Sequence, residues 1–129
     1  MYWLPAHGAT VSVPVGHSPD YDVIADWGAG HLERVQGKTS TFRERGRWAV
    51  RLATSGGNQS WNRIIKVLDS SRCDRVFIHV GDGRRWFIPA AAIEGRISII
   101  VGGRKYSEFE VEPGDPLPMR MAAQNAARG

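Results

Sequence analysis

The sequence predicts a single α+β or α/β domain built around a β-sheet. Segments in which apolar and polar residues alternate outnumber helical segments, and their order is strands, one helix, then more strands. A chain of 129 residues suits one domain. Because Pro116 and Pro118 break regular structure after Gly114, we expect the domain to span residues 1–114 and a flexible C-terminal tail to span 115–129.

Four strands are expected in the first half of the chain. Alternating valines predict an edge strand over 9–15. An apolar run over 21–26 and a more polar strand over 34–40 flank a glycine-containing turn, and together they predict a β-hairpin. Residues 47–52 alternate again, with the large apolar side chains on one side of the strand and the arginines on the other.

The second half is expected to begin with a helix and to continue in strands. Ser60 is a suitable helix cap, and the apolar residues Trp61, Ile64, Ile65 and Leu68 follow the spacing of an amphipathic helix. Beyond the helix we expect a hairpin closed by Gly81-Asp82-Gly83, and one helical turn over 90–93. The expected strands are 75–80, 84–88, 97–101 and 107–112.

The net charge of +4 permits a nucleic-acid partner but does not require one. The distribution of charge is more informative, because six basic residues and one acidic residue lie between Arg34 and Arg51. Such a cluster is either a solvated surface or a set of phosphate contacts. Its overlap with the candidate site described next favours phosphate contacts.

Cysteine and hydropathy exclude several classes of protein. The lone Cys73 cannot form an intrachain disulfide, and no run approaches the roughly 20 apolar residues that cross a membrane. We therefore expect a soluble cytoplasmic protein without a membrane partner. The histidines show no zinc-ligand spacing with one another or with Cys73, and His79 is interpreted as a core or surface-strand residue.

The candidate site lies on the predicted hairpin. Gln36 and Lys38 share one face of their strand because side chains alternate with a period of two, and the turn can bring Asp22 to them. Asp20 is a rival for the acidic position because it follows Pro19, but Asp22 leads directly into the apolar strand. Asp26 has the parity to share that face, where it would bind a second ion or, as we prefer, cap the turn.

Asp22 followed by Gln36-Gly37-Lys38 resembles the motif of the PD-(D/E)XK nuclease superfamily. In that superfamily an Asp on one strand and a Glu or Gln two residues before a Lys on the next strand form the catalytic core. The Gln form, together with the stretches at 57–61 and 80–89, is most similar to the group I intron-associated endonucleases. The similarity extends over residues 4–114.

This resemblance implies a restriction-endonuclease-like fold with a central mixed β-sheet flanked by few helices. It also implies a Mg²⁺-dependent endonuclease that cuts double-stranded DNA, with Asp22, Gln36 and Lys38 as catalytic residues. Asp22, the Gln36 amide and the Gly37 carbonyl would be the metal ligands. Cutting of both strands implies a homo-oligomer. The expected DNA contacts are Ser40, Arg43, Arg45 and Arg47.

Two features depart from the family pattern. These nucleases usually carry a Glu on a helix before the first strand, but residues 1–19 contain no acidic side chain. Residues 1–4 resemble the last turn of that helix, ended by Pro5 and Gly8, so we expect a truncated first helix. Gly37 stands where a bulky β-forming residue is usual. Two alternatives therefore stay open: a truncated, non-catalytic DNA-binding remnant, and a β-rich interaction domain unrelated to nucleic acid.

Overall fold

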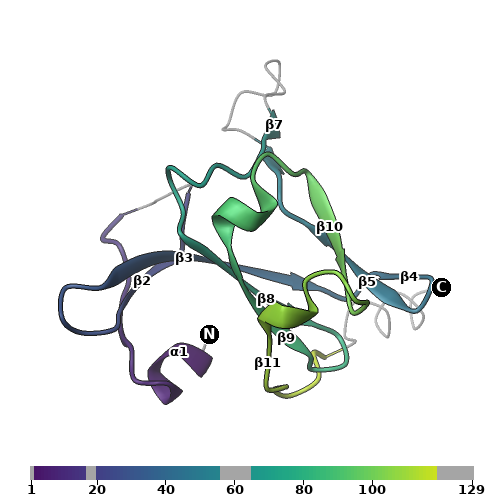
Figure 1. Ribbon diagram of the computed structural model, residues 1–129, viewed down its shortest axis with the longest axis horizontal. Helices are drawn as coiled ribbons and strands as arrows, with labels where there is room; N and C mark the ends of the chain where they lie inside the picture. The colour runs from purple at the N-terminus through teal and green to yellow at the C-terminus, as the bar shows by residue number, and fades with distance from the viewer. Residues whose placement is uncertain (1, 17–19, 56–64, 119–129) are drawn as a thin grey trace.

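The computed structural model describes residues 2–16, 20–55 and 65–118, and its strands form three sheets (Figure 1). One sheet has six strands in the order β1-β2-β3-β8-β9-β11, and a second has three in the order β10-β5-β4. Strands β6 and β7 pair with each other. The strands are β1 (Thr10–Ser12), β2 (Val23–Asp26), β3 (Leu32–Ser40), β4 (Arg43–Glu44), β5 (Arg47–Arg51), β6 (Thr54–Ser55), β7 (Ile65–Lys66), β8 (Arg75–Val80), β9 (Arg85–Pro89), β10 (Ser98–Val101) and β11 (Glu110–Val111). The helical elements are α1 (Trp3–Ala6) and the 3-10 turns η1 (Ala90–Ile93) and η2 (Ser107–Phe109).

The six-stranded sheet is mixed, which confirms the expected α+β architecture with few helices. Strands β3 and β8 run parallel, from Val35 beside Arg75 to Ser40 beside Val80. The other neighbouring pairs in this sheet are antiparallel. The predicted edge strand is confirmed, because β1 is the outermost strand on its side of the sheet. The predicted β2–β3 hairpin is also confirmed.

Two hydrophobic clusters lie on opposite faces of the six-stranded sheet. Strand β8 contributes to both, because Val76 and Ile78 belong to one cluster and Phe77, between them, belongs to the other. The larger cluster also contains residues of β5, β9, β10 and η1, so it fills the space between the two sheets. The smaller cluster is covered by α1, whose Leu4 is fully buried. A strand that is buried on both faces is a central strand.

Three expected elements differ from the structure. Ile65 and Lys66 form strand β7, paired with β6, so the helix predicted through Ile65 and Leu68 is wrong there. Trp61 and Ile64 lie outside the described residues. The strand predicted over 107–112 begins as the 3-10 turn η2, because Tyr106 before it has φ 68°, and only Glu110–Val111 is a strand. Pro5 lies within α1 and does not end it, since the first turn of a helix tolerates proline.

The chain stays in contact with the sheet beyond Gly114, where we expected a tail to begin. The backbone N–H of Leu117 donates to the carbonyl of Gly81 at 3.1 Å. The Nε2 atom of His79 lies 2.7 Å from the carbonyl oxygen of Asp115. The segment through Leu117 therefore packs against the β8–β9 turn. Among the described residues, no helix is long and apolar enough to cross a membrane.

Candidate active site

The β2–β3 hairpin places Asp22 beside Gln36 and Gly37. Val23 is opposite Val35 in the antiparallel register, so Asp22, one residue earlier, comes beside Gln36, one residue later. The backbone N–H of Asp22 donates to the Val35 carbonyl at 2.9 Å. In return, the backbone N–H of Gly37 donates to the Asp22 Oδ2 atom at 2.7 Å. Two hydrogen bonds therefore fix the position of the Asp22 carboxylate against β3.

Gln36 and Lys38 lie on the same face of β3 as Asp22. Val35 is buried in the smaller cluster, so its neighbour Gln36, and Lys38 two residues on, point to the opposite side of the sheet. Both side chains are partly buried. Burial lowers the pKa of the Lys38 ammonium, while the negative charge of Asp22 raises it and the positive charge of Arg51 lowers it further. The predicted trio of Asp22, Gln36 and Lys38 is therefore brought together on one surface.

The rival acidic residues have other partners. Asp20 lies 3.9 Å from the guanidinium of Arg72. Asp26 accepts the backbone N–H of Gly28 at 2.9 Å, so it caps the hairpin turn as we preferred. Within the described residues, no group of three or more His, Cys, Asp or Glu side chains is placed to hold a metal ion. Of the three acidic residues considered for the site, Asp22 is the one whose carboxylate lies against β3 beside Gln36 and Gly37.

Comparison with known families agrees with this geometry. The model of the PD-(D/E)XK endonuclease family matches residues 1–99, which include the whole Asp22–Lys38 site. The chain belongs to this family. No curated protein sequence matches the chain. The solved structure of the bacterial homing endonuclease I-Ssp6803I is 19% identical and has a TM-score of 0.65, with an alignment covering 98% of this chain and 87% of that one.

The structural likeness shows that the fold is shared, and membership of the PD-(D/E)XK endonuclease family supports a nuclease function. Lys38 lies on β3, the strand that pairs with β2 after Asp22. The catalytic roles expected of Asp22, Gln36 and Lys38 stay predictions.

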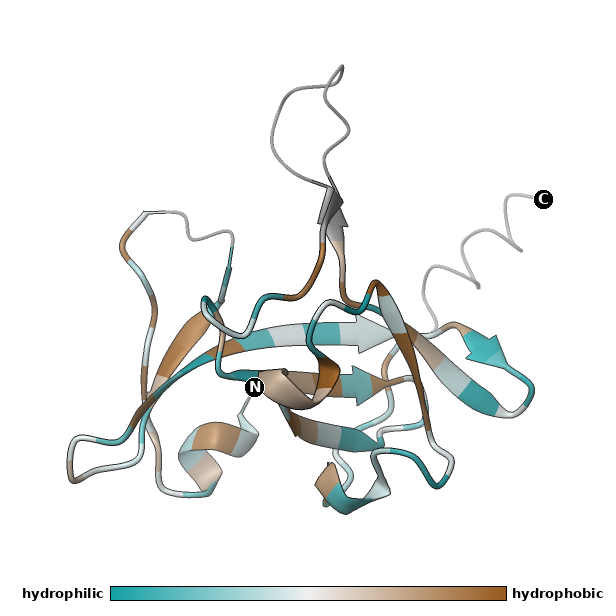
Figure 2. Cartoon of the chain, turned by 45° about the horizontal axis from the view of Figure 1, so that its top comes forward, coloured by the Kyte–Doolittle hydropathy of each residue, from teal (hydrophilic) through white to brown (hydrophobic). Residues whose placement is uncertain are grey.

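The four expected DNA contacts of this PD-(D/E)XK chain lie close in sequence but do not share one face. Arg43 is paired with Trp48, whose side chain is buried, and its guanidinium lies 4.7 Å from the centre of that ring. Arg45 is in the β4–β5 turn with φ 52°, and Arg47 is exposed on the other face of β5. Figure 2 shows the hydrophilic residues of this hairpin in teal.

Ser40 has a structural role within the sheet. Its hydroxyl donates to the Ala49 carbonyl of β5 and accepts the backbone N–H of Phe42. These bonds join the end of β3 to β5. The Ser40 hydroxyl therefore already has two hydrogen-bond partners within the protein. The phosphate contact expected of Ser40 stays a prediction.

Arg51 is a basic residue near the site that belongs to the basic cluster of the sequence but is not among the four expected DNA contacts. It is exposed at the end of β5, and its charge acts on Lys38. The alternation of β5 showed that Arg51 faces away from Trp48 and Val50. The alternation could not predict that β5 lies beside the end of β3, because the Ser40–Ala49 hydrogen bond that joins them links two different sheets.

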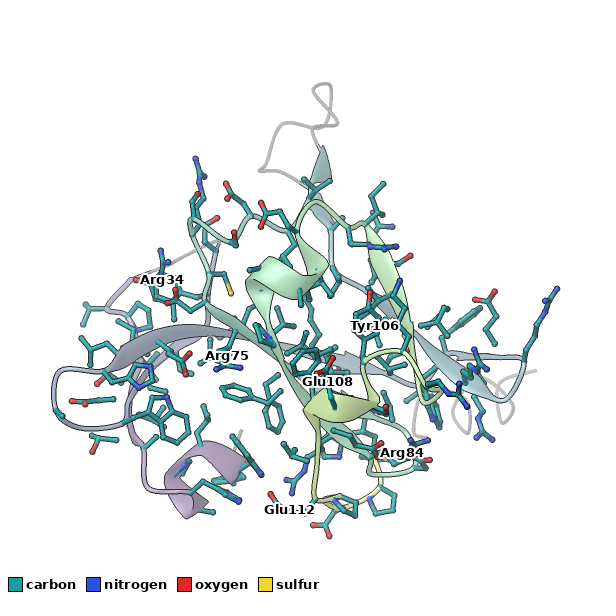
Figure 3. The ribbon with its side chains drawn as sticks, in the orientation of Figure 1. Arg34, Arg75, Arg84, Tyr106, Glu108 and Glu112 are labelled. Atoms are coloured by element: carbon teal, nitrogen blue, oxygen red, sulfur yellow. The ribbon has the colours of Figure 1, made fainter. Side chains whose placement is uncertain are left out.

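An ion pair at the start of β8 fixes the strand that carries Lys38. The Asp74 carboxylate accepts three N–H groups of Arg34: the backbone N at 2.7 Å, Nε at 2.9 Å and Nη2 at 3.0 Å. Arg34 hydrogen bonding holds the pKa of the Asp74 carboxyl below its usual range. Next to it, Arg75 pairs with Glu33 at 2.8 Å. Figure 3 labels Arg34 and Arg75 at this end of the sheet. These contacts set the parallel register of β3 and β8 immediately before Gln36.

Proposed function

We propose that this chain is a Mg²⁺-dependent endonuclease that hydrolyses phosphodiester bonds of double-stranded DNA, of the group I intron-associated type. The observation that carries the proposal is the placement of Asp22, Gln36 and Lys38 on one face of the β2–β3 hairpin, with Asp22 held by the Gly37 N–H at 2.7 Å. The chemistry of these oxygen donors suits Mg²⁺, which prefers oxygen ligands and keeps several waters.

The residues that would hold Mg²⁺ are Asp22, Gln36 and Gly37. Asp22 has one oxygen committed to the Gly37 N–H, and its second oxygen, Oδ1, has no hydrogen-bond partner in the part of the chain that the structure describes. The Gln36 amide oxygen and the Gly37 carbonyl are neutral donors. When bound, Mg²⁺ would neutralise phosphate charge and promote ionisation of a water molecule.

Lys38 has two roles in this proposal. Its ammonium group stabilises the negative charge that develops on the phosphate, as a fixed positive group does at sites of phosphoryl chemistry. Burial lowers the pKa of its ammonium group, and a neutral amine at this position could accept a proton from the attacking water. The negative charge of Asp22 acts in the opposite direction: it raises the pKa of Lys38 and so favours the ammonium form.

One site cuts one strand, so double-strand cleavage requires a second copy of the site. We propose that the chain acts as a homo-oligomer on the duplex. A single-site monomer would nick supercoiled plasmid but would linearise it only slowly.

The test is cleavage of supercoiled plasmid DNA by purified protein with Mg²⁺ and with EDTA. We expect nicking and linearisation with Mg²⁺ and no cleavage with EDTA. Lys38→Ala should abolish cleavage, whereas Lys105→Ala, which removes an exposed lysine beside Tyr106, should cleave at the wild-type rate. Equal cleavage by the wild type and Lys38→Ala would refute the assignment.

The scarcity of carboxylates favours a second candidate. The described residues provide one acidic ligand at the site. In this alternative, the chain binds DNA as a non-catalytic member of the family. It predicts salt-sensitive binding to a duplex, with no Mg²⁺-dependent cleavage at any protein concentration. The plasmid assay separates the two candidates directly.

A further inference from the structure

The three-stranded sheet has one side that is open to solvent. In β5, Trp48 and Val50 are buried while Arg47 and Arg51 are exposed; in β10, Ile99 and Val101 are buried while their neighbours are exposed. Both strands therefore turn the same side toward the larger core. The opposite side, which we call the open face, carries Phe42, Glu44, Arg47, Ala49, Arg51 and Ile100.

An apolar row crosses the open face between two arginines. Ile100 is opposite Ala49 in the β10–β5 register, and the backbone N–H of Ala49 donates to the carbonyl of Phe42 at 2.9 Å. The row Phe42–Ala49–Ile100 thus runs across the strands. Phe42 is 69% exposed and Ile100 is 37% exposed, so this apolar surface is available to a partner. Arg47 lies on one side of the row and Arg51 on the other.

The spacing of the two arginines matches a dimension of DNA. Arg47 and Arg51 are four residues apart on one strand, which corresponds to about 13 Å between their Cα atoms at about 3.3 Å per residue. The major groove of B-DNA is about 12 Å wide between its phosphate backbones. Two arginines at this spacing can contact phosphates on opposite sides of one groove, while the residues between them face the base edges.

The open face is continuous with the candidate active site. The Ser40 hydroxyl at the end of β3 donates to the Ala49 carbonyl, in the middle of the face. Lys38 is two residues before Ser40, and Arg51 is two residues after Ala49. Strands β3 and β5 are in contact with each other. A duplex bound at Lys38 therefore passes beside Arg51.

We propose that the open face is the surface on which a DNA duplex docks and its sequence is read. Arg51 and Arg47 contact phosphates across one major groove, and Phe42 and Ile100 contact base edges, among which the thymine methyl group is the apolar feature. This proposal rests on the proposed function, since it assumes a DNA substrate. Glu44 is opposite Arg47 in the hairpin, so Arg51 contributes more to phosphate binding than Arg47 does.

The first experiment measures the affinity of the wild type for a 24-base-pair duplex of random sequence, in EDTA, over a range of salt concentrations. Each phosphate contact contributes about 0.9 to the slope of log K against log salt, so Arg51→Ala should reduce the slope by about 1. Arg47→Ala should reduce it by a smaller amount. Arg85→Ala is the control, because Arg85 lies on β9 of the six-stranded sheet, where its Nε donates to the Glu112 carbonyl, and it should leave the slope unchanged.

The second experiment tests base reading by selecting bound duplexes from a randomised pool. The wild type should enrich thymine at one or two adjacent positions, and Phe42→Ala should lose that enrichment while keeping the wild-type salt slope. A structural effect of Phe42→Ala would instead lower the melting temperature and change every position of the selected sequence. Loss of enrichment at all positions together with a lower melting temperature would overturn the role given to Phe42.

The outcomes separate this inference from the proposed function. If the wild type cleaves plasmid DNA but Arg51→Ala and Arg47→Ala keep its salt slope, the open face is not the docking surface and the nuclease assignment stands. If the variants lose slope although the wild type never cleaves, the docking surface stands and the chain is a DNA-binding protein. Self-association through the open face, detected as dimers that Phe42→Ala dissociates without DNA, would also overturn the docking proposal.

Discussion

Two substitutions of Asp22 separate its chemical role from its structural role. Asn has nearly the same shape as Asp, and its side-chain oxygen can still accept the Gly37 N–H that now donates to Asp22 Oδ2 at 2.7 Å. Asn lacks the negative charge. Ala removes both the charge and the acceptor. Asp22→Asn should therefore retain the stability of the wild type, whereas Asp22→Ala should not, and neither should bind Mg²⁺ well.

The sizes of the two effects differ. Loss of one hydrogen bond costs about 0.5–1.5 kcal/mol, and the exposure of Asp22 places Asp22→Ala toward the lower end of that range. For a domain of this size that corresponds to a fall of roughly 2–5 °C in melting temperature. Both variants should lose at least about 100-fold in cleavage rate, since even residues that only support a metal ligand contribute up to about 100-fold.

The assay combines thermal unfolding with cleavage of plasmid DNA at saturating protein over a titration of Mg²⁺. The expected pattern is two inactive variants, of which only Asp22→Ala is less stable. If Asp22→Asn cleaves as the wild type does, Asp22 is not a metal ligand. If both variants unfold at the same lower temperature, the carboxylate charge stabilises the fold and the hydrogen bond to Gly37 does not carry the structural role assigned to it.

Three further predictions concern neighbouring residues. Asp74→Ala should lower the free energy of unfolding by about 1–2 kcal/mol, discounted because Asp74 and Arg34 are each about one-third exposed. The pKa of Asp74 is lower in the folded state than in the unfolded state, so the stability difference between wild type and variant should be fully present above the unfolded pKa of about 3.9. It should disappear as the pH falls through the pKa of folded Asp74. Urea titrations that give a stability difference independent of pH would contradict this prediction. Cys73 is 2% exposed and burial raises its pKa, so a thiol reagent at pH 8 should label it slowly in native protein and rapidly in denaturant; equal rates would show that the site opens readily. Gln36→Glu should place a second carboxylate beside Asp22. Repulsion between the two charges should lower the melting temperature in EDTA, and Mg²⁺ should stabilise the variant more than the wild type. An unchanged melting temperature in both conditions would show that the two side chains do not meet.

The β2–β3 hairpin could be predicted because its determinants are local. The alternation of apolar residues identifies the buried face, and the turn between the strands uses positive φ angles at Gly28, Ala29 and Gly30. The β8–β9 hairpin followed from the same kind of evidence, with Gly83 at φ 97° in its turn. In both hairpins the pairing partner is the next strand in the chain, so sequence proximity supplies the register.

The pairing of β3 with β8 could not be predicted in the same way. Val35 and Arg75 are 40 residues apart, and the two strands are parallel, so no turn links them. Their register depends on Asp74 receiving the N–H groups of Arg34, which is a contact between residues that no local pattern relates. The helix predicted through Ile65 failed for a similar reason, because β7 pairs with β6 and tertiary pairing overrides helical periodicity in a short segment.

Strand β3 shows why the site and the fold have to be tested separately. Val35 lies in the smaller core on one face, while Gln36 and Lys38 lie on the other, and Ser40 at its end joins the three-stranded sheet. The apolar residues and the backbone hydrogen bonds hold the strand in place, whereas the Lys38 side chain makes no hydrogen bond or ion pair among the described residues. A chain could therefore lose Lys38 and keep this fold. For that reason a shared fold at 19% identity cannot establish cleavage, and the activities of Asp22→Asn and Lys38→Ala can.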